Sequence, residues 1–149
     1  MIEEIEQNYA TVKEIVAKLK QGEIVNQLPS LWSNNQKSAL IQALILRTID
    51  LVIFTELKAD GTHAVFIGND ELSAIKEFTN DEFKINWRNG QKFSEIYPIF
   101  RELLMTREIE TRTIHEKDSS AIPDIIWVNN LPQFRVNVIR VVDNSEMEF

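Results

Sequence analysis

The stretch that decides the fold runs from residue 39 to residue 67. It reads Ala39-Leu40-Ile41-Gln42-Ala43-Leu44-Ile45-Leu46, then Ile49-Asp50-Leu51-Val52-Ile53-Phe54-Thr55-Glu56-Leu57, and finally Asp60-Gly61 followed by Thr62-His63-Ala64-Val65-Phe66-Ile67. The first run is apolar nearly all round, which is typical of a helix buried on most sides. The second run is too rich in β-branched residues to continue the helix and predicts a buried strand. Asp-Gly between two apolar runs favours a type I′ hairpin, because both central residues of that turn need a positive φ.

Helix-start and helix-end signals lie upstream of this stretch. Ser33-Asn34-Asn35-Gln36 has the Ser-x-x-Gln form of a capping box and predicts the start of the buried helix. Residues 2–21 carry one apolar stripe at helical spacing, with glutamates in the first turn and lysines in the last. Gly22 stands where a left-handed C-cap is expected. We therefore predict a first helix over residues 2–21, whose apolar face docks on the protein's own core or, alternatively, on a partner.

Two more helices are predicted downstream. Asn69 or Asp70 is expected to cap the first of them. The second is expected over residues 95–106, with Ser94 as cap and Pro98 in the opening turn, where a missing amide donor matters least. The residues expected to face inward are Leu72, Ile75 and Phe78 in the first helix and Ile96, Ile99, Phe100, Leu103 and Leu104 in the second.

Further strands are predicted between and after these helices. Residues 82–88 alternate between apolar and polar side chains, which indicates a half-exposed strand that ends at the Asn89-Gly90 turn. Residues 107–116 are polar and threonine-rich, as in an edge strand. Two more strands are expected over residues 125–128 and 134–142.

These elements predict the order α-α-β-β-α-β-α-β-β-β. Three final strands with no helix between them argue against a purely parallel sheet. We predict an α+β fold as a single domain over residues 1–142, with a mixed or mostly antiparallel sheet of about five to six strands and helices on one face. The acidic tail, residues 143–149, is expected to fray.

The residue inventory removes many activities. The chain has 149 residues and no cysteine, which excludes disulfides, thiolate metal sites and cysteine nucleophiles. Its four glycines fall at no phosphate-binding spacing, and its two histidines, His63 and His115, form no metal-binding motif. Asp50 has apolar neighbours in sequence, as a general acid requires, but a solvent-facing position at a strand start is the simpler interpretation. We predict no catalytic residue, no metal and no cofactor.

The chain is acidic, with a formal net charge of -7. Long-range electrostatics therefore oppose nucleic-acid phosphates and anionic membranes, and neither is an expected partner. No apolar run approaches the roughly 20 residues of a membrane helix. The first six residues, Met-Ile-Glu-Glu-Ile-Glu, are acidic where a signal peptide would be basic. We expect a cytoplasmic protein whose negative surface steers it toward a basic protein partner.

Two groups of residues are candidates for binding that partner. Glu3, Glu4 and Glu6 lie on the polar face of the predicted first helix. Trp32 precedes the buried helix, and Trp87-Arg88-Asn89 stands at a predicted strand-to-turn junction. Tryptophan and arginine are the side chains most enriched at interface hot spots. The alternatives are that Trp87 continues the core stripe of Phe83 and Ile85 and that Trp32 plugs a helix end.

From about Ala39 to Leu104 the chain resembles the N-terminal domain of the SseB-like proteins, which are named for enhanced serine sensitivity. The similarity lies in an apolar helix running into a strand over residues 44–54, in Asp60-Gly61, and in a return strand before a helix with Glu71-Leu72. The family's Phe-Thr-Ser/Asp segment corresponds here to Phe66-Ile67-Gly68-Asn69-Asp70, so the threonine is absent and one extra residue intrudes. The resemblance implies a non-catalytic module, and related domains occur among proteins proposed as toxin-immunity factors.

The sequence therefore predicts a non-catalytic protein-binding module, such as an immunity factor, an adaptor or a chaperone-like protein, that acts through an acidic surface. One alternative is a structural subunit or homodimer that packs through its N-terminal helix. A further alternative is a small enzyme that uses carboxylates or the two histidines.

Overall fold

The structure is a computed structural model, and it describes residues 5–115. The chain divides into two compact units, residues 7–113 and residues 1–6 with 114–149, so the single domain stays a prediction. No helix among the described residues has the length and apolar character to cross a bilayer. The elements in chain order are β1 (Ile5–Thr11), α1 (Val12–Gln21), β2 (Ile24–Val25), α2 (Asn34–Leu46), β3 (Val52–Leu57), β4 (His63–Ile67), α3 (Asn69–Thr79), a 3-10 turn (Trp87–Asn89), α4 (Pro98–Met105) and β5 (Glu108–His115).

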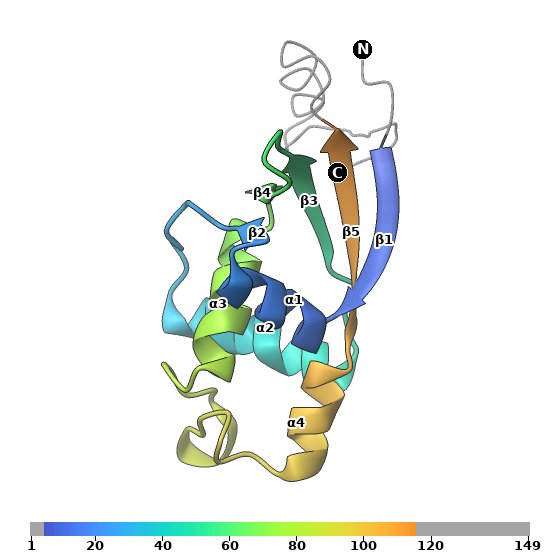
Figure 1. The fold of residues 1–149 in the computed structure, drawn as a ribbon. Helices are drawn as coiled ribbons and strands as arrows, with labels where there is room; N and C mark the ends of the chain where they lie inside the picture. Colours follow the sequence, from blue (N-terminus) through green and yellow to red (C-terminus); the bar gives the residue numbers. More distant parts are fainter. Residues whose placement is uncertain (1–4, 116–149) are drawn as a thin grey trace. The chain divides into compact units, whose positions relative to one another are not determined.

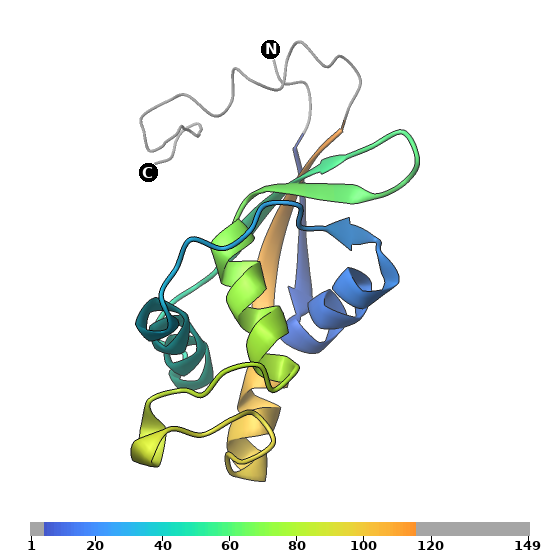
Figure 2. The same cartoon turned by 90° about the vertical axis from the view of Figure 1, so that its left-hand side faces the viewer.

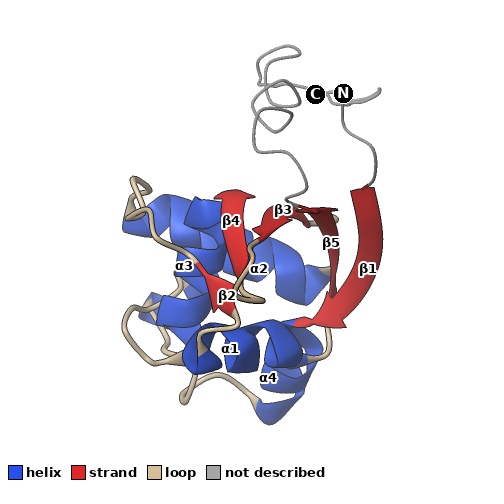
Figure 3. Cartoon of the chain, turned by 45° about the horizontal axis from the view of Figure 1, so that its top comes forward, coloured by secondary structure: helices blue, strands red, loops and turns tan. Residues whose placement is uncertain are grey.

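The five strands of the described chain form one sheet in the order β1-β5-β3-β4-β2 (Figure 3). Strands β3 and β4 are antiparallel, whereas β2 pairs with β4 in parallel. The arrows of β3 and β5 point the same way in Figure 1, and that of β1 points the opposite way. Helices α1, α2 and α3 lie to the left of β5 in Figure 1, and α3 passes in front of β5 in Figure 2. The predicted α+β fold with a mixed sheet is confirmed, although the order of its elements differs.

The first helix begins at Val12, so the prediction of a helix over residues 2–21 was wrong for its first half. Thr11 and Glu14 form a capping box: Thr11 Oγ1 accepts from the Glu14 amide at 3.1 Å, and Glu14 Oε1 accepts from the Thr11 amide at 2.8 Å. Residues Ile5–Thr11 form strand β1 instead, and Tyr9 is 61% exposed. A Thr-x-x-Glu start signal therefore outweighs the apolar stripe that continues upstream of it.

The apolar face of α1 docks on the protein's own core, as the simpler interpretation of the sequence predicted. Val12, Ile15 and Val16 are all buried. Gly22 forms the expected left-handed C-cap at φ 80°, and its amide binds carbonyl oxygens of the last turn.

Helix α2 begins with the predicted capping box, in which Ser33 Oγ and Gln36 Oε1 each bind the other residue's amide. The N-cap of α3, in contrast, is Gly68 and not Asn69 or Asp70. The Asp70 carboxylate instead accepts from the Ser30 hydroxyl at 2.9 Å, which ties the start of α3 to the segment before α2. The buried face of α3 is as predicted, because its three expected residues are 0–1% exposed.

The predicted β3–β4 hairpin forms, but its turn is not type I′. Gly61 has a positive φ of 90°, whereas Asp60 does not. The Gly61 amide binds the Lys58 carbonyl at 3.0 Å, and the Lys58 amide binds the Thr62 carbonyl at 2.8 Å, as in a type I turn followed by a glycine bulge. Asp60 Oδ1 accepts from both the amide and the hydroxyl of Thr62, and this local contact accounts for the different turn.

Residues 82–88 do not form the predicted strand. The Asn86 amide donates to Ser38 Oγ at 2.9 Å, so this segment binds helix α2 rather than a neighbouring strand. Its inward alternation is nevertheless correct, because Phe83 and Ile85 are buried while Lys84 is exposed.

Helix α4 begins at Pro98, three residues later than predicted, and Ser94 is not its cap. The reason is Pro98 itself, because a residue that precedes proline is driven out of the helical region, and Tyr97 is extended at ψ 143°. Ile99 was expected to face inward but is 56% exposed. Ile96 is buried as expected, although it precedes the helix.

Strand β5 was predicted as an edge strand and is not one, because β1 and β3 lie on either side of it. The misread segment Ile5–Thr11 supplies the edge instead. The strands predicted over 125–128 and 134–142, and the tail 143–149, lie outside the described residues.

Candidate functional site: an aromatic pocket beside helix α4

A shallow pocket with a volume of about 280 Å³ opens where the C-terminal end of α2, the 3-10 turn and the start of α4 meet. Three of its six lining side chains are aromatic, and we call it the aromatic pocket. It is lined by Leu46, Trp87, Arg88, Gln91, Tyr97 and Phe100.

Trp87 is the anchor of this pocket. Its indole Nε1–H donates to Gln42 Oε1 on α2 at 2.7 Å. Its ring meets that of Phe100 edge to face, with 5.1 Å between centroids, and Phe100 in turn lies 5.9 Å from Tyr97. Aromatic pairs in such geometries attract beyond their buried area. The three rings therefore form one connected cluster, half-buried, with Trp87 also packed against the core.

A tight backbone turn presents Arg88 at the pocket. Ile85 and Gln91 form a two-way backbone bridge, which closes a short loop over the intervening residues. Within it Arg88 adopts φ 49° and ψ 51°, and Asn89 adopts φ 68°. An arginine in the left-handed region costs of order 1 kcal/mol and persists only where its surroundings hold it.

Tyr97 holds the Arg88 side chain. The guanidinium carbon of Arg88 lies 5.2 Å from the centroid of the Tyr97 ring, in a cation–π contact. Its Nη1 also donates to the Tyr97 hydroxyl. The structure therefore fixes a cation at the rim of an apolar pocket.

Large apolar side chains around the pocket remain in contact with solvent. Leu46 is 58% exposed and lines the pocket, as does Tyr97 at 53%. Ile99 is 56% exposed on the neighbouring turn of α4. Single exposed apolar residues are ordinary, but several around one concave site indicate an interaction surface.

The pocket lies in a cationic stretch of an acidic chain. Between residues 84 and 101 the sequence has four cations and a single carboxylate, Glu95. Glu95 Oε1 accepts from the Lys92 amide at 2.8 Å and so caps its own turn. Among the described residues, no carboxylate lines the pocket.

The structure brings together only some of the residues that the sequence singled out. Trp87 and Arg88 share the pocket, and Asn89 lies exposed in the adjoining turn. Trp32 is not among the pocket-lining residues and is half-buried against the core. Glu6 forms an ion pair with His115 Nε2 at 3.0 Å. Glu3 and Glu4 lie outside the described residues.

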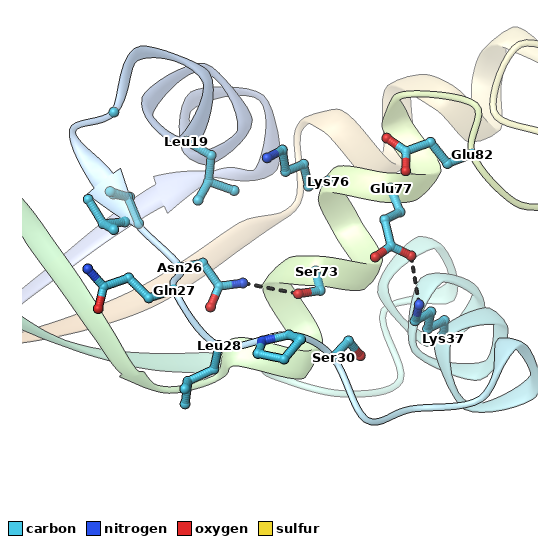
Figure 4. Close-up of a pocket in the computed structure, with 14 residues that line it drawn as sticks. Leu19, Asn26, Gln27, Leu28, Ser30, Lys37, Ser73, Lys76, Glu77 and Glu82 are labelled. Atoms are coloured by element: carbon cyan, nitrogen blue, oxygen red, sulfur yellow. Dashed lines mark hydrogen bonds and ion pairs between the residues drawn. The ribbon is translucent and has the colours of Figure 1, made fainter.

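A larger hollow of about 670 Å³, which we call the polar groove, lies between α1, α3 and the segment that precedes α2 (Figure 4). Some of its polar side chains are paired with one another. Lys37 Nζ lies 2.7 Å from Glu77 Oε1, and Asn26 Nδ2 donates to Ser73 Oγ at 3.1 Å, as Figure 4 shows. Side chains that already make hydrogen bonds to one another gain little free energy by binding a ligand instead.

The side chains considered for catalysis are dispersed. Asp50 is 97% exposed and pairs with Arg107, as the solvent-facing interpretation predicted. His63 Nδ1 lies 3.4 Å from Thr55 Oγ1, a residue buried next to Thr113. Within residues 5–115 there is no group of three or more histidine and carboxylate side chains that could hold a metal ion.

The perturbed carboxylates have structural causes. Hydrogen bonds from Thr11, Thr62 and Ser94 lower the pKa of Glu14, Asp60 and Asp81 respectively. Burial raises the pKa of Glu71, and the neighbouring charge of Asp70 adds to that effect. None of these four residues lines either hollow.

Sequence reasoning missed most of the pocket wall. Leu46 and Phe100 were assigned to the core, and Tyr97 and Gln91 were not considered. The sequence signal that could have pointed to Tyr97 is the dipeptide Tyr97-Pro98. A residue that precedes proline is disfavoured in the helical region, so Tyr97 is not expected to continue the helix face that packs on the core.

Comparison of the chain with protein-family models, with curated proteins and with solved structures finds no match.

Proposed function

We propose that this protein is a non-catalytic protein-binding module and that the aromatic pocket is its contact surface. The observation that carries the proposal is the arrangement of Trp87, Tyr97 and Arg88 around one exposed apolar hollow. Tryptophan, tyrosine and arginine dominate the residues that contribute most to protein–protein affinity. The pocket volume of about 280 Å³ lies at the lower end of the range of small-molecule sites, which begins at roughly 300 Å³, and is large enough for one inserted side chain.

The pre-arranged side chains support the same proposal. The Trp87 indole is already hydrogen-bonded and the Arg88 guanidinium already lies on the Tyr97 ring. Side chains fixed before association lose little conformational entropy when a partner arrives. The roles of immunity factor, adaptor and chaperone-like protein all remain within this proposal, and the resemblance to SseB-like N-terminal domains agrees with a non-catalytic module.

A homodimer is the second candidate, in a form that differs from the sequence-based one. The apolar face of α1 is buried in the protein's own core. A dimer would therefore use other exposed apolar side chains, such as Leu46, which lines the aromatic pocket, and Ile99, which precedes Phe100 in α4.

Photo-crosslinking in the native cell tests the proposal. p-Benzoylphenylalanine is placed at Leu46, which lines the pocket, and in a matched protein at Tyr9, which is comparably exposed on β1. We expect a discrete adduct with another protein from position 46 only, and its loss when Arg88→Glu is added. The same adducts from both positions, or none from position 46, would contradict the proposal. An adduct with a second copy of this chain would favour the homodimer.

A further inference from the structure

We infer that the aromatic pocket recognises an acidic segment of its partner, in which a large apolar side chain enters between Trp87 and Tyr97 and a neighbouring carboxylate pairs with Arg88. The inference rests on the proposed function, because it names the partner chemistry of the same surface. It also differs from what the net charge suggests, since a chain with a formal charge of -7 is expected to attract a basic partner.

The first argument is the unused hydrogen-bonding capacity of Arg88. A guanidinium carries five N–H donors in a planar fork that matches a carboxylate. Within the described chain, the hydrogen bond to the Tyr97 hydroxyl is the one that this guanidinium makes. The remaining donors are presented to solvent, because Arg88 is exposed. A partner carboxylate is the ligand that uses them best.

The second argument is the sign of the charges around the pocket. Leu46, Gln91 and Phe100 are each followed directly by a cation, namely Arg47, Lys92 and Arg101. The one carboxylate of the stretch 84–101, Glu95, is already bound to a backbone amide of its own turn. Salt screens charges beyond about 8–10 Å at physiological ionic strength, so a ligand at Arg88 responds mainly to the charges close to it and less to the net charge of the whole chain.

The third argument is the fit between hollow and side chain. The walls are the apolar surfaces of Leu46, Trp87 and Phe100, and the volume of about 280 Å³ accommodates one phenylalanine or leucine side chain. A partner segment with one large apolar side chain flanked by carboxylates would therefore place the apolar side chain in the pocket and a carboxylate at Arg88. A basic segment would place its charges against Arg88 and its neighbours.

A pair of blocked peptides tests this inference on the full chain. The probe is acetyl-Glu-Glu-Phe-Leu-Glu-Glu-amide, and its matched control has lysine in place of every glutamate. Binding is followed by the nitrogen–proton NMR signal of the Trp87 indole, which reports on the Nε1–H bonded to Gln42. We expect the acidic peptide to shift this signal and the amide signals of the surrounding turn, with an affinity at least about tenfold above that of the basic peptide.

Substitutions separate the pocket from general electrostatics. Arg88→Gln is expected to weaken the acidic peptide about five- to thirtyfold, since a charge-assisted pair is lost. Lys20→Gln, which removes an exposed cation from α1, is the matched control and is expected to leave the affinity within about twofold. Unchanged spectra elsewhere in both variants confirm that each one is folded.

Several results would overturn the inference. These are equal or tighter binding of the basic peptide at the same signals, no binding of either peptide, or an affinity that Arg88→Gln does not change. Indole shifts that depend on protein concentration alone would show that a second copy occupies the pocket. If a protein crosslinks at Leu46 while the peptides show no preference for acidic residues, that result would support the protein-binding function and contradict only the preference for an acidic partner segment.

Discussion

The polar groove and the aromatic pocket differ in how much hydrogen-bonding capacity and apolar surface their side chains leave free for a ligand. The polar groove is the larger, at about 670 Å³ against about 280 Å³, yet its Lys37 is bound to Glu77 and its Asn26 to Ser73. The aromatic pocket is smaller, but its apolar walls contact solvent and its arginine has donors to spare. The aromatic pocket is therefore the better candidate for a binding surface because of its free donors and exposed apolar walls, although its volume is smaller.

The largest expected effect comes from the core that separates the two hollows. Helix α2 has Lys37 of the groove near its start and Leu46 of the pocket at its end, and Ile41 between them is fully buried. Ile41→Ala is expected to lower the free energy of unfolding by about 3 kcal/mol, from lost burial plus the cavity that remains. Urea denaturation measures the change, and Ile41→Val should cost about 1 kcal/mol. Equal, small losses for both variants would show that the site collapses around the deletion.

Trp87→Phe is expected to separate the pocket from the fold. It keeps an aromatic ring beside Phe100 but removes the donor to Gln42, which costs about 1–2 kcal/mol of stability. The affinity for the acidic peptide, followed here by the amide signals of the surrounding turn because the indole is absent, should fall at the same time, since the pocket wall shrinks. Trp32→Phe is the control, because Trp32 does not line the pocket, and it should leave peptide affinity unchanged. Loss of affinity in both variants would mean that the surface is not confined to the pocket.

Breaking the ion pair of the polar groove is expected to have a smaller and purely structural effect. Lys37→Gln leaves Glu77 without its partner, and the two side chains are 12% and 30% exposed. We expect a loss of about 1 kcal/mol in thermal or urea unfolding, with no change in peptide affinity at the aromatic pocket. Lys76→Gln, an exposed lysine of the same groove, should change stability by less than about 0.5 kcal/mol. A change in peptide affinity for Lys37→Gln would show that the two hollows are coupled.

The smallest expected effect is a dependence on pH at α3, the helix that contributes Ser73 and Glu77 to the groove. Burial raises the pKa of Glu71 in the folded state, so its ionisation opposes folding. The contribution of Glu71 to stability is therefore greatest at low pH and is lost as pH rises from about 4 through the raised pKa. Glu71→Gln should match the parent near pH 4 and exceed it at pH 7 by about 1 kcal/mol or less.

Denaturation of Glu71→Gln and the parent over that pH range measures this difference. Glu108→Gln, an exposed residue of β5, is the control. A variant less stable than the parent at pH 7 would show that the negative charge near the N-terminus of α3 matters more than its burial.

Signals confined to one turn of chain predicted the structure well. The Ser33–Gln36 capping box and the Gly22 C-cap appear where the sequence placed them, because the bonds they make lie within a few residues. The apolar spacing on α3 was also sufficient, since a helix with one apolar face has one side to bury. The hairpin formed as predicted, although a side-chain bond within the turn changed its type.

Signals that depend on distant partners predicted it less well. The apolar residues of Ile5–Thr11 are too few to distinguish a strand from a helix, and pairing with β5, about a hundred residues later, decides between them. The same long-range pairing moved β5 from the edge to the interior of the sheet. Residues 82–88 kept their inward pattern but became a loop, because Ser38 on α2 captures the Asn86 amide.

The residues of the candidate site also divide into those that the sequence singled out and those that only the tertiary structure revealed. By itself the sequence determined an acidic α+β chain without thiols, and it singled out Trp87 and Arg88 as side chains suited to an interface. Only the tertiary structure decided that Leu46, Tyr97 and Phe100 join them around one hollow. The physical reason is the distance along the chain over which each interaction acts. Helix capping and apolar periodicity depend on residues three or four positions apart, whereas the pocket depends on which side chains face one another once α2 and α4 have packed.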